Sequence, residues 1–360
     1  MRILHIIDSL GRGGAETLLV TVINNLPDFD HHVISLSENT TLSTDITTSC
    51  QITKLNFKTK LDTWRSTRFI RKYIQQNEIQ VVHSHLVMAN IISRLATPRT
   101  VPLFNSLHSL NGSRLFSRKF SWQRVVEKLT YKKRHHLIAV SKTVLNDYNE
   151  FVGVKGEATV LYNFVDDRFF ADKPKMDQPT NQLRLVAVGS LKEQKNFEFV
   201  IDAFPGLPKI VSMDIYGDGP LKNLLLKRIE EHSVPVALKG VRTDIYDVLP
   251  QYDLFVMSSN IEGHPVALLE AMACGMPTIV SKIPVLIEAT GGKGLYFSLA
   301  NSDEFLELIG KIIEGNINLS DYASHNLSHA NKIARKSMYL STLTQLYKSA
   351  MDATIYHGHE

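Results

Sequence analysis

Residues 253–281 read DLFVMSSNIEGHPVALLEAMACGMPTIVS and contain two apolar runs separated by a stretch of helical length. The runs at 253–259 and 277–281 have the composition of strands that are covered on both faces of a sheet. Pro265 suits the first position of a helix, which we expect to run through Val266 to Ala273 and to stop near Gly275. Strand, helix and strand in this order predict a parallel sheet.

The same alternation continues through most of the chain. Helical patterns such as 64–77 and 219–232 separate the strand-like runs. These runs form two series, one at 2–8, 31–37, 79–84, 101–107 and 136–141, the other at 183–189, 210–217, 253–259 and 277–281. Two such series predict two doubly wound α/β domains, whose ligands bind beyond the carboxyl ends of the strands.

The boundary between the series is polar. Residues 164–182 contain two prolines and lack sustained periodicity, which is typical of an interdomain connection. The stretch 319–356 has a helical pattern that can pack back across either domain. We therefore expect an N-terminal domain at 1–165, a linker at 166–182, a C-terminal domain at 183–340 and a C-terminal helix at 341–360, with packing on the N-terminal domain as one option.

Composition excludes several classes of protein. The chain has 360 residues, of which 44% are hydrophobic and 21% charged, so it is neither disordered nor fibrous. A net charge of +4 is too small to indicate nucleic acid as a partner. Two cysteines cannot form a disulfide framework. The N-terminus has only a short apolar run, so we expect a cytoplasmic protein without a signal peptide or membrane span.

The helix at 266–273 is the strongest candidate for a ligand site. Amide groups at its start, residues 264–267, make an anion site after the strand 253–259. Glu262 lies in the preceding loop and Glu270 on the second turn, and carboxylates bind sugar hydroxyls well. The alternative is that Glu262 caps the helix and Glu270 faces solvent.

The spacing of these two acids resembles the E-x7-E signature of retaining family 4 glycosyltransferases with the GT-B fold. Other landmarks occur in the family's order: GGAE at 13–16, NSLHS at 105–109, AVS at 139–141, YNFVDDRFF at 162–170, VGSLKEQKNF at 188–197 and YGDGPL at 216–221. The resemblance covers nearly the whole chain. It implies two Rossmann-like domains that face each other across a cleft.

The resemblance also implies roles for individual residues. On the donor side it implies Gly14, Ser190, Lys195, Gly217, Val241, Arg242, Glu262, Gly263, His264, Pro265, Val266, Ala267 and Glu270. On the acceptor side it implies Gly13, Gly14 and His108, and as catalytic residues His108, Lys195 and Glu262. One departure stands out: the family has an arginine after the strand glycine, whereas Ser190 follows Gly189 here. Lys195 is then the principal cation for a diphosphate.

Residues 114–136 form a basic segment with eight Lys/Arg and one Glu, interleaved with apolar residues. Such a segment can lie on an anionic membrane surface, on the inner face of the membrane for a cytoplasmic protein. The alternative is a helix that packs on the core and exposes a solvated basic face. His83 and His85 could be metal ligands, but no acid or cysteine completes a set, so we expect no essential metal or other cofactor.

We therefore predict a retaining glycosyltransferase of the EC 2.4 class, moving a hexose or N-acetylhexosamine from a nucleotide sugar. UDP is the favoured nucleotide, and a glycan or lipid-linked hydroxyl in cell-surface polysaccharide or glycolipid synthesis is the expected acceptor. A nucleotide-sugar epimerase and a non-catalytic nucleotide-sugar binder remain as alternatives. A nicotinamide oxidoreductase is weaker, because Glu16 stands where a dinucleotide fingerprint has its third glycine.

Overall fold

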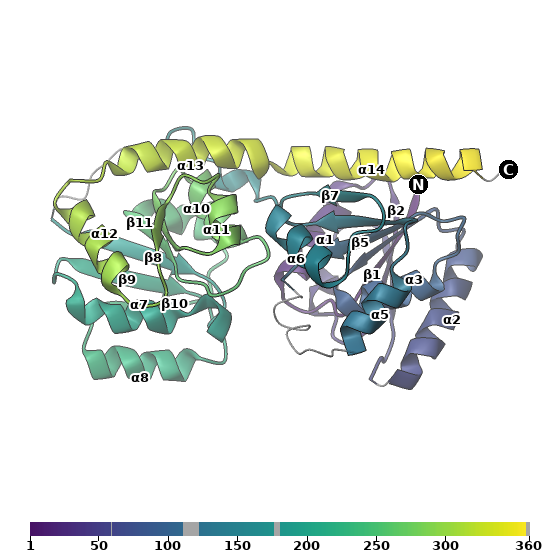
Figure 1. Cartoon of the computed structure of the whole chain (residues 1–360), viewed down its shortest axis with the longest axis horizontal. Coiled ribbons are helices and arrows are strands. Elements are labelled where there is room, and N and C mark those ends of the chain that lie inside the picture. Colours follow the sequence, from purple (N-terminus) through teal and green to yellow (C-terminus); the bar gives the residue numbers. More distant parts are fainter. Residues whose placement is uncertain (59, 111–121, 176–180, 358–360) are drawn as a thin grey trace. The chain divides into compact units, whose positions relative to one another are not determined.

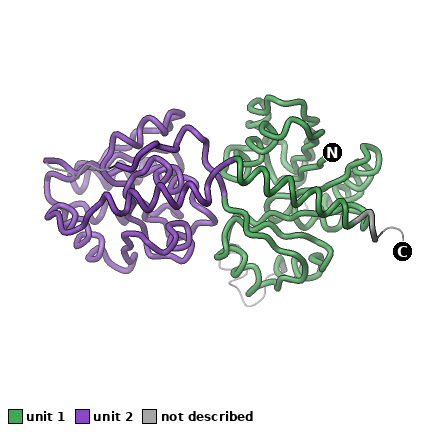
Figure 2. Tube along the Cα trace, turned by 90° about the horizontal axis from the view of Figure 1, so that it is seen from above, with its two compact units in different colours: residues 1–162, 337–360 green, residues 163–336 purple. Residues whose placement is uncertain are grey.

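The computed structural model describes residues 1–58, 60–110, 122–175 and 181–357, and the chain forms two compact units (Figure 2). Unit 1 comprises residues 1–162 and 337–360, and unit 2 comprises residues 163–336. Each unit contains one parallel sheet with helices packed against it (Figure 1). The predicted class of two Rossmann-like α/β domains is confirmed.

Unit 1 has a seven-stranded sheet in the order β3-β2-β1-β4-β5-β6-β7, with every pair parallel. The strands are β1 (Arg2–Ile7), β2 (Asp30–Ser35), β3 (Cys50–Lys54), β4 (Val81–His85), β5 (Leu103–Leu107), β6 (His135–Ala139) and β7 (Ala158–Val160). The α-helices are α1 (Gly14–Asn25), α2 (Lys60–Gln76), α3 (Val87–Ala96), α5 (Trp122–Thr130), α6 (Lys142–Phe151) and α14 (Lys336–His357), whose first residue belongs to unit 2. The strand order reverses direction between β1 and β4.

Unit 2 has a six-stranded parallel sheet in the order β10-β9-β8-β11-β12-β13. Its strands are β8 (Leu183–Val188), β9 (Val211–Tyr216), β10 (Val236–Gly240), β11 (Leu254–Met257), β12 (Thr278–Ser281) and β13 (Leu295–Phe297). Its α-helices are α7 (Phe197–Ala203), α8 (Lys222–His232), α9 (Ile245–Val248), α10 (Val266–Ala273), α11 (Pro284–Ala289), α12 (Asp303–Ile313) and α13 (Leu319–Ile333). The reversal lies here between β8 and β11.

Both faces of the unit 2 sheet are buried, as the apolar strand sequences predict. Leu183, Leu185 and Ala187 of β8 belong to one hydrophobic cluster, whereas Val186, between them, belongs to another. Successive residues of a strand point to opposite faces, so β8 contributes to a core on each side. Burial of each leucine or valine side chain of β8 stabilises the unit by about 1.5–3 kcal/mol.

The predicted strands omit four that the structure contains: β3, β7, β10 and β13. They are the two edge strands of each sheet. Edge strands have a partner on one side only, and three of these four are partly exposed along most of their length. Their sequences therefore lack the long apolar run that identifies a central strand.

The segment after β7 belongs to unit 2. The amide of Val165 donates to the carbonyl of Ala334 at 3.0 Å, and that of Ala171 to Ala273 at 2.9 Å. The described part of the expected linker 166–182 is therefore attached to unit 2. Unit 2 ends at Lys336 rather than 340, because Tyr347 of α14 is buried in unit 1 beside His83. No helix among the described residues is sufficiently long and apolar to cross a bilayer.

Candidate functional site

The candidate site of unit 2 lies at the carboxyl end of its sheet, where the strand order reverses. Lys195 ends a 3₁₀ turn, Glu193–Lys195, that follows β8. Glu262 lies in the loop between β11 and α10. In open α/β sheets, the loops at such a reversal point surround the ligand.

Lys195 and Glu262 form an ion pair, with 2.6 Å between Lys195 Nζ and Glu262 Oε1. The Ser259 hydroxyl donates to the same oxygen at 2.7 Å. The two side chains are only 19% and 12% exposed, so solvent screens the pair weakly. The structure thus brings two of the predicted catalytic residues into direct contact.

Serine side chains fix the loops that carry this ion pair. Ser258 Oγ donates to the backbone carbonyls of Lys195 at 3.0 Å and Asn196 at 2.9 Å. Ser281 Oγ donates to the carbonyl of Ser259 at 2.6 Å. These serines were not predicted as site residues. Ser258 follows β11 and Ser281 ends β12. Serines at the carboxyl ends of two neighbouring strands are the sequence feature that could have identified them.

Two glycines allow the loops after β8 and β9 to approach each other. A Cβ atom on Gly217 would lie 1.9 Å from the Gly189 carbonyl oxygen, and Gly217 has φ of +148°. A Cβ atom on Gly189 would lie 3.1 Å from Lys195 Cε. The missing side chain of Gly189 therefore leaves room for the aliphatic part of Lys195. The missing side chain of Gly217 lets its backbone pack against the Gly189 carbonyl.

Helix α10 begins at Val266, with Pro265 as its N-cap rather than its first residue. Pro265 has no N–H group, so it cannot contribute to the predicted anion site at 264–267. The amide of Leu268 is bonded to the Pro265 carbonyl at 3.1 Å. Val266 and Ala267 belong to the first turn of α10. The N–H groups of a first turn have no acceptor within the helix. They are the remaining donors for an anion.

Asn163 holds the residue that precedes this helix. Its backbone amide donates to His264 Nδ1 at 3.2 Å, and its side-chain amide donates to the His264 carbonyl at 3.1 Å. His264 is buried, and burial lowers its pKa to about 4, so the ring is neutral near pH 7. His264 is therefore a structural anchor of the loop, and Asn163, within the quoted landmark 162–170, is its partner.

Glu270 lies on the second turn of α10 and is partly buried. Among the described residues, its carboxyl group makes no hydrogen bond or ion pair. Burial and, to a smaller extent, the charge of Asp166 raise its pKa to about 8, against the opposing effect of Lys195. The group is therefore largely protonated near pH 7, and it is available to a ligand that offers hydroxyl groups.

The other predicted donor-side residues of unit 2 are more exposed. Ser190 follows Gly189 and is exposed. Val241, after β10, is 65% exposed. Arg242 Nε donates to Asp244 Oδ1 at 2.7 Å, so its guanidinium is bound to that carboxylate rather than to the Lys195–Glu262 pair. Among the described contacts, none joins Ser190, Val241 or Arg242 to the Lys195–Glu262 pair or to Glu270.

Unit 1 carries the predicted acceptor-side residues. Gly13 is the N-cap of α1, and a Cβ atom there would lie 2.3 Å from Glu16 Oε2. Gly14 has open space, with nothing within 4 Å of the position of a Cβ atom. His108 follows β5, and its Nε2 lies 3.2 Å from His85 Nδ1. Burial lowers the pKa of His108 to about 4.

Asp8 was not predicted as a site residue, although it directly follows β1, between that strand and the glycine-rich turn at 11–14. Its Oδ1 accepts from the amide of Ala89 at 2.7 Å, at the start of α3. Burial raises the pKa of Asp8 to about 6. The sequence feature that could have identified it is an acid just after a central strand. In the structure this acid caps the start of α3.

The basic segment 114–136 is described from Trp122 onward, and residues 114–121 lie outside the described residues. Helix α5 exposes Val125 by 40% and Leu129 by 65%. Its Glu127 points to the core, where it forms an ion pair with the buried Arg94 and accepts from the Tyr148 hydroxyl at 2.9 Å. The helix therefore has a core-packing face as well as an apolar exposed one.

Comparison with known proteins defines the class. The family model Glycosyltransferase Family 4 matches residues 12–169, and the model Glycosyl transferases group 1 matches residues 182–315. The chain belongs to the family 4, group 1 glycosyltransferases. The family predicted from the sequence is confirmed, and the chain is a glycosyltransferase.

Individual relatives are distant. EpsF of Bacillus subtilis (strain 168), itself assigned as a glycosyltransferase, is 25% identical over 342 residues, 84% of each chain. The UDP-Gal:α-D-GlcNAc-diphosphoundecaprenol α-1,3-galactosyltransferase of Escherichia coli is 29% identical over 238 residues, which cover 59% of this chain and 60% of that protein.

Two solved structures share the fold. HepE of Anabaena, crystallised with UDP, has a TM-score of 0.82 at 20% identity, covering 97% of this chain and 100% of that one. Sucrose-phosphate synthase from Thermosynechococcus elongatus also has a TM-score of 0.82, at 15% identity, covering 98% and 100%. These likenesses establish the GT-B fold.

Proposed function

We propose that the chain moves a hexose or N-acetylhexosamine from a UDP-sugar to a hydroxyl group of a glycan or lipid-linked acceptor, with retention of anomeric configuration. The observation that carries this proposal is the Lys195–Glu262 ion pair beside α10, whose Glu270 carboxyl has no partner among the described residues. The UDP complex of HepE and the UDP-galactose donor of the Escherichia coli relative support the choice of nucleotide.

Lys195 and the start of α10 would hold the diphosphate. The lysine ammonium has three N–H donors, and Glu262 accepts one of them. The remaining donors, with the amides of Val266 and Ala267, suit the oxygens of a phosphate group. Glu262 keeps the ammonium in place and also offers an oxygen to a hydroxyl of the sugar.

Glu270 would bind the ribose. Its carboxyl group can accept hydroxyl hydrogen bonds, and in its protonated form it can also donate one. Because no described residue satisfies it, a ribose would supply the partners that the free protein does not. Hydrogen bonds between neutral groups of this kind contribute about 0.5–1.5 kcal/mol each.

In the proposed reaction, the bond between the sugar C1 and the diphosphate oxygen breaks while the acceptor oxygen bonds to C1 on the same face. The proton of the acceptor hydroxyl passes to the leaving phosphate. Negative charge develops on the diphosphate, so Lys195 and the two amides stabilise the transition state more than the ground state. Neither glutamate acts as a nucleophile, and the step needs no metal.

Unit 1 would supply the acceptor side through Gly13, Gly14 and His108. The open space over Gly14 permits a substrate to approach the start of α1 closely. His108 is neutral near pH 7, so its nitrogens can exchange hydrogen bonds with hydroxyl groups without adding charge. A neutral side chain suits an acceptor hydroxyl better than it suits a diphosphate.

We also propose that unit 1 binds an anionic inner membrane surface through 114–136, where a lipid-linked acceptor would lie. Leu129 adjoins a hollow of about 570 Å³ that is also lined by Arg99, Lys132, Lys133 and Arg134. Each basic residue near such a surface contributes roughly 1 kcal/mol. The protein should therefore sediment with anionic vesicles and not with neutral ones, and equal sedimentation with both would exclude this role.

Nucleotide-sugar screening tests the proposed function. UDP-sugars should raise the melting temperature of the purified chain, because a ligand that binds only the folded state stabilises it. The best donor is then incubated with and without acceptor, and NMR follows the sugar. Transfer with an unchanged anomeric configuration supports the proposal. Epimerised donor, or binding without release of UDP, would instead indicate one of the two alternative functions.

A further inference from the structure

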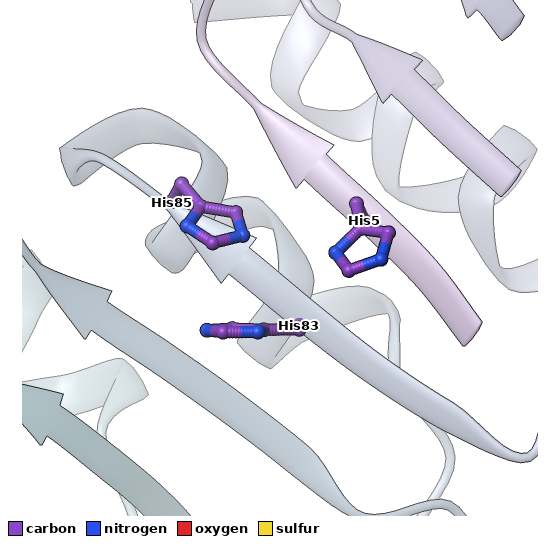
Figure 3. Close-up of side chains that lie close together, drawn as sticks. All are labelled: His5, His83 and His85. Carbon is purple, nitrogen blue, oxygen red and sulfur yellow. The ribbon is translucent and has the colours of Figure 1, made fainter. Parts of the chain in front are cut away.

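Unit 1 contains a cluster of three buried histidines that the proposed reaction does not use. His5 lies on β1, and His83 and His85 lie on the neighbouring strand β4 (Figure 3). His5 pairs with His83 in the register of the two strands, and His85 is two residues further along, so all three share one face of the sheet. One ring nitrogen from each lies within 4.8 Å of the others.

A hydrogen bond from His31 to a backbone carbonyl fixes the proton positions on His31 and on the neighbouring His5. His31 Nε2 lies 2.9 Å from the Leu26 carbonyl oxygen, which only accepts, so that nitrogen carries the proton. In a neutral imidazole one nitrogen carries the proton and the other a lone pair, so His31 Nδ1 is an acceptor. His31 Nδ1 then accepts from His5 Nε2 at 3.2 Å. His5 Nδ1 is therefore left with a lone pair and no proton.

This lone pair lies in the interior without a partner. His5 Nδ1 and His85 Nε2 are both buried and have no hydrogen bond within the described residues, and the two side chains are 0% and 3% exposed. Figure 3 shows each of these rings turning a nitrogen toward the other. A buried acceptor with no donor is costly, and a cation resolves it.

We propose that unit 1 binds one divalent transition-metal ion, of the class of Zn²⁺, through His5 Nδ1, His85 Nε2 and a ring nitrogen of His83. Neutral imidazole is the form that binds such metals. The opposite nitrogens of two of these rings already bond to other histidines, His5 to His31 and His85 to His108. A metal-binding histidine usually has a hydrogen-bond partner on its other ring nitrogen, which fixes the ring orientation.

His83 has to exchange a partner for the metal. Its Nδ1 lies 2.5 Å from the Tyr347 hydroxyl and its Nε2 lies 2.7 Å from Ser106 Oγ. Zinc–nitrogen bonds are about 2.0–2.1 Å long, which places tetrahedral ligands roughly 3.4 Å apart. The three rings must therefore move closer than their present 4.8 Å spread, with His83 releasing one hydroxyl. The bound ion would cross-link β1 and β4, the two central strands of the sheet.

Metal titration of the full chain tests this proposal. The protein is treated with a chelator and titrated with Zn²⁺, Co²⁺ and, as a control, Mg²⁺, which prefers oxygen ligands. The wild type should bind one Zn²⁺ or Co²⁺ per chain, with a Co²⁺ absorption spectrum typical of nitrogen ligands. His5→Asn should weaken binding about 100-fold or more, since even outer-sphere changes weaken it 10- to 100-fold.

His135→Asn is the matched control, because His135 is buried on β6 of the same unit and outside the cluster. It should leave metal affinity unchanged. Circular dichroism checks that each variant folds. If His5→Asn does not fold, X-ray absorption of the zinc-loaded wild type tests the proposal instead. We expect it to show three histidine nitrogen ligands. Equal affinity of the wild type and His5→Asn, or a zinc shell without histidine nitrogens, would overturn the proposal.

Discussion

The two sheets have the same doubly wound order around their central strands, but different side chains gather at the point where each order reverses. In unit 2 these are charged or acidic: Lys195, Glu262 and Glu270. In unit 1 they are imidazoles, which burial keeps neutral near pH 7: His5, His83, His85 and His108. The topology fixes where a ligand binds, whereas these side chains decide which kind of ligand it is.

Charge is also placed differently within the two units. One ion pair of unit 1, Arg94 with Glu127, is 0% and 4% exposed and lies in the core. The Lys195–Glu262 pair of unit 2 lies in loops at the carboxyl end of the sheet, at 19% and 12% exposure. We infer that the first pair stabilises the fold and that the second serves the ligand. Matched substitutions can separate these roles.

The largest effect is expected from Glu127→Gln. It leaves the Arg94 guanidinium buried without its counter-ion, which should lower the free energy of unfolding by about 3–5 kcal/mol. Glu262→Gln, the matched change in unit 2, should lower it by less than Glu127→Gln does, because this pair is more exposed, while reducing transfer. Urea denaturation measures both. Similar destabilisation by the two variants would contradict the inference that only the Arg94–Glu127 pair serves mainly to stabilise the fold.

A loss of transfer is expected from Lys195→Ala. Without its ammonium the leaving diphosphate loses a stabilising charge, so kcat should fall about 10²- to 10³-fold. Lys192→Ala removes an exposed lysine from the same loop and should change kcat less than about threefold. Turnover of UDP-sugar measures both variants. Near wild-type turnover by Lys195→Ala would remove this lysine from the reaction.

A smaller, pH-dependent effect on stability is expected from Glu270→Gln. Burial raises the pKa of Glu270 from 4.5 to about 8 in the folded state. Between these values the unfolded chain ionises first, so wild-type stability falls as pH rises through this range. The variant should therefore melt at a higher temperature than the wild type above pH 8, with the difference shrinking toward pH 4.5. A pH-independent difference would contradict a buried, protonated Glu270.

The sequence predicted the central parts of both sheets because their strands are long and apolar. It also predicted α10 at 266–273, where the structure has Val266–Ala273. The four edge strands escaped prediction because partial exposure weakens their apolar pattern. The GT-B fold and the family were predicted from motifs in their order along the chain, which no single motif could have established.

Contacts between distant residues could not be predicted in the same way. The spacing of Glu262 and Glu270 indicated a site, but not that Lys195 would bond to Glu262 across 67 positions. Metal binding was set aside because His83 and His85 lacked a third ligand in sequence. Strand pairing brings His5, 78 residues earlier, opposite His83. Such pairings depend on register, which one sequence does not display.

The most direct test of the donor site in unit 2 is calorimetric titration of UDP into the wild type, Glu270→Ala and Glu230→Ala. Glu230 is exposed on α8 of the same unit and serves as the control. We expect the wild type and Glu230→Ala to bind UDP alike, and Glu270→Ala, which removes the hydrogen bonds to the ribose, to bind it at least about 10-fold more weakly. Equal UDP affinity in all three proteins, or no binding by the wild type, would contradict the assignment of unit 2 as the donor site.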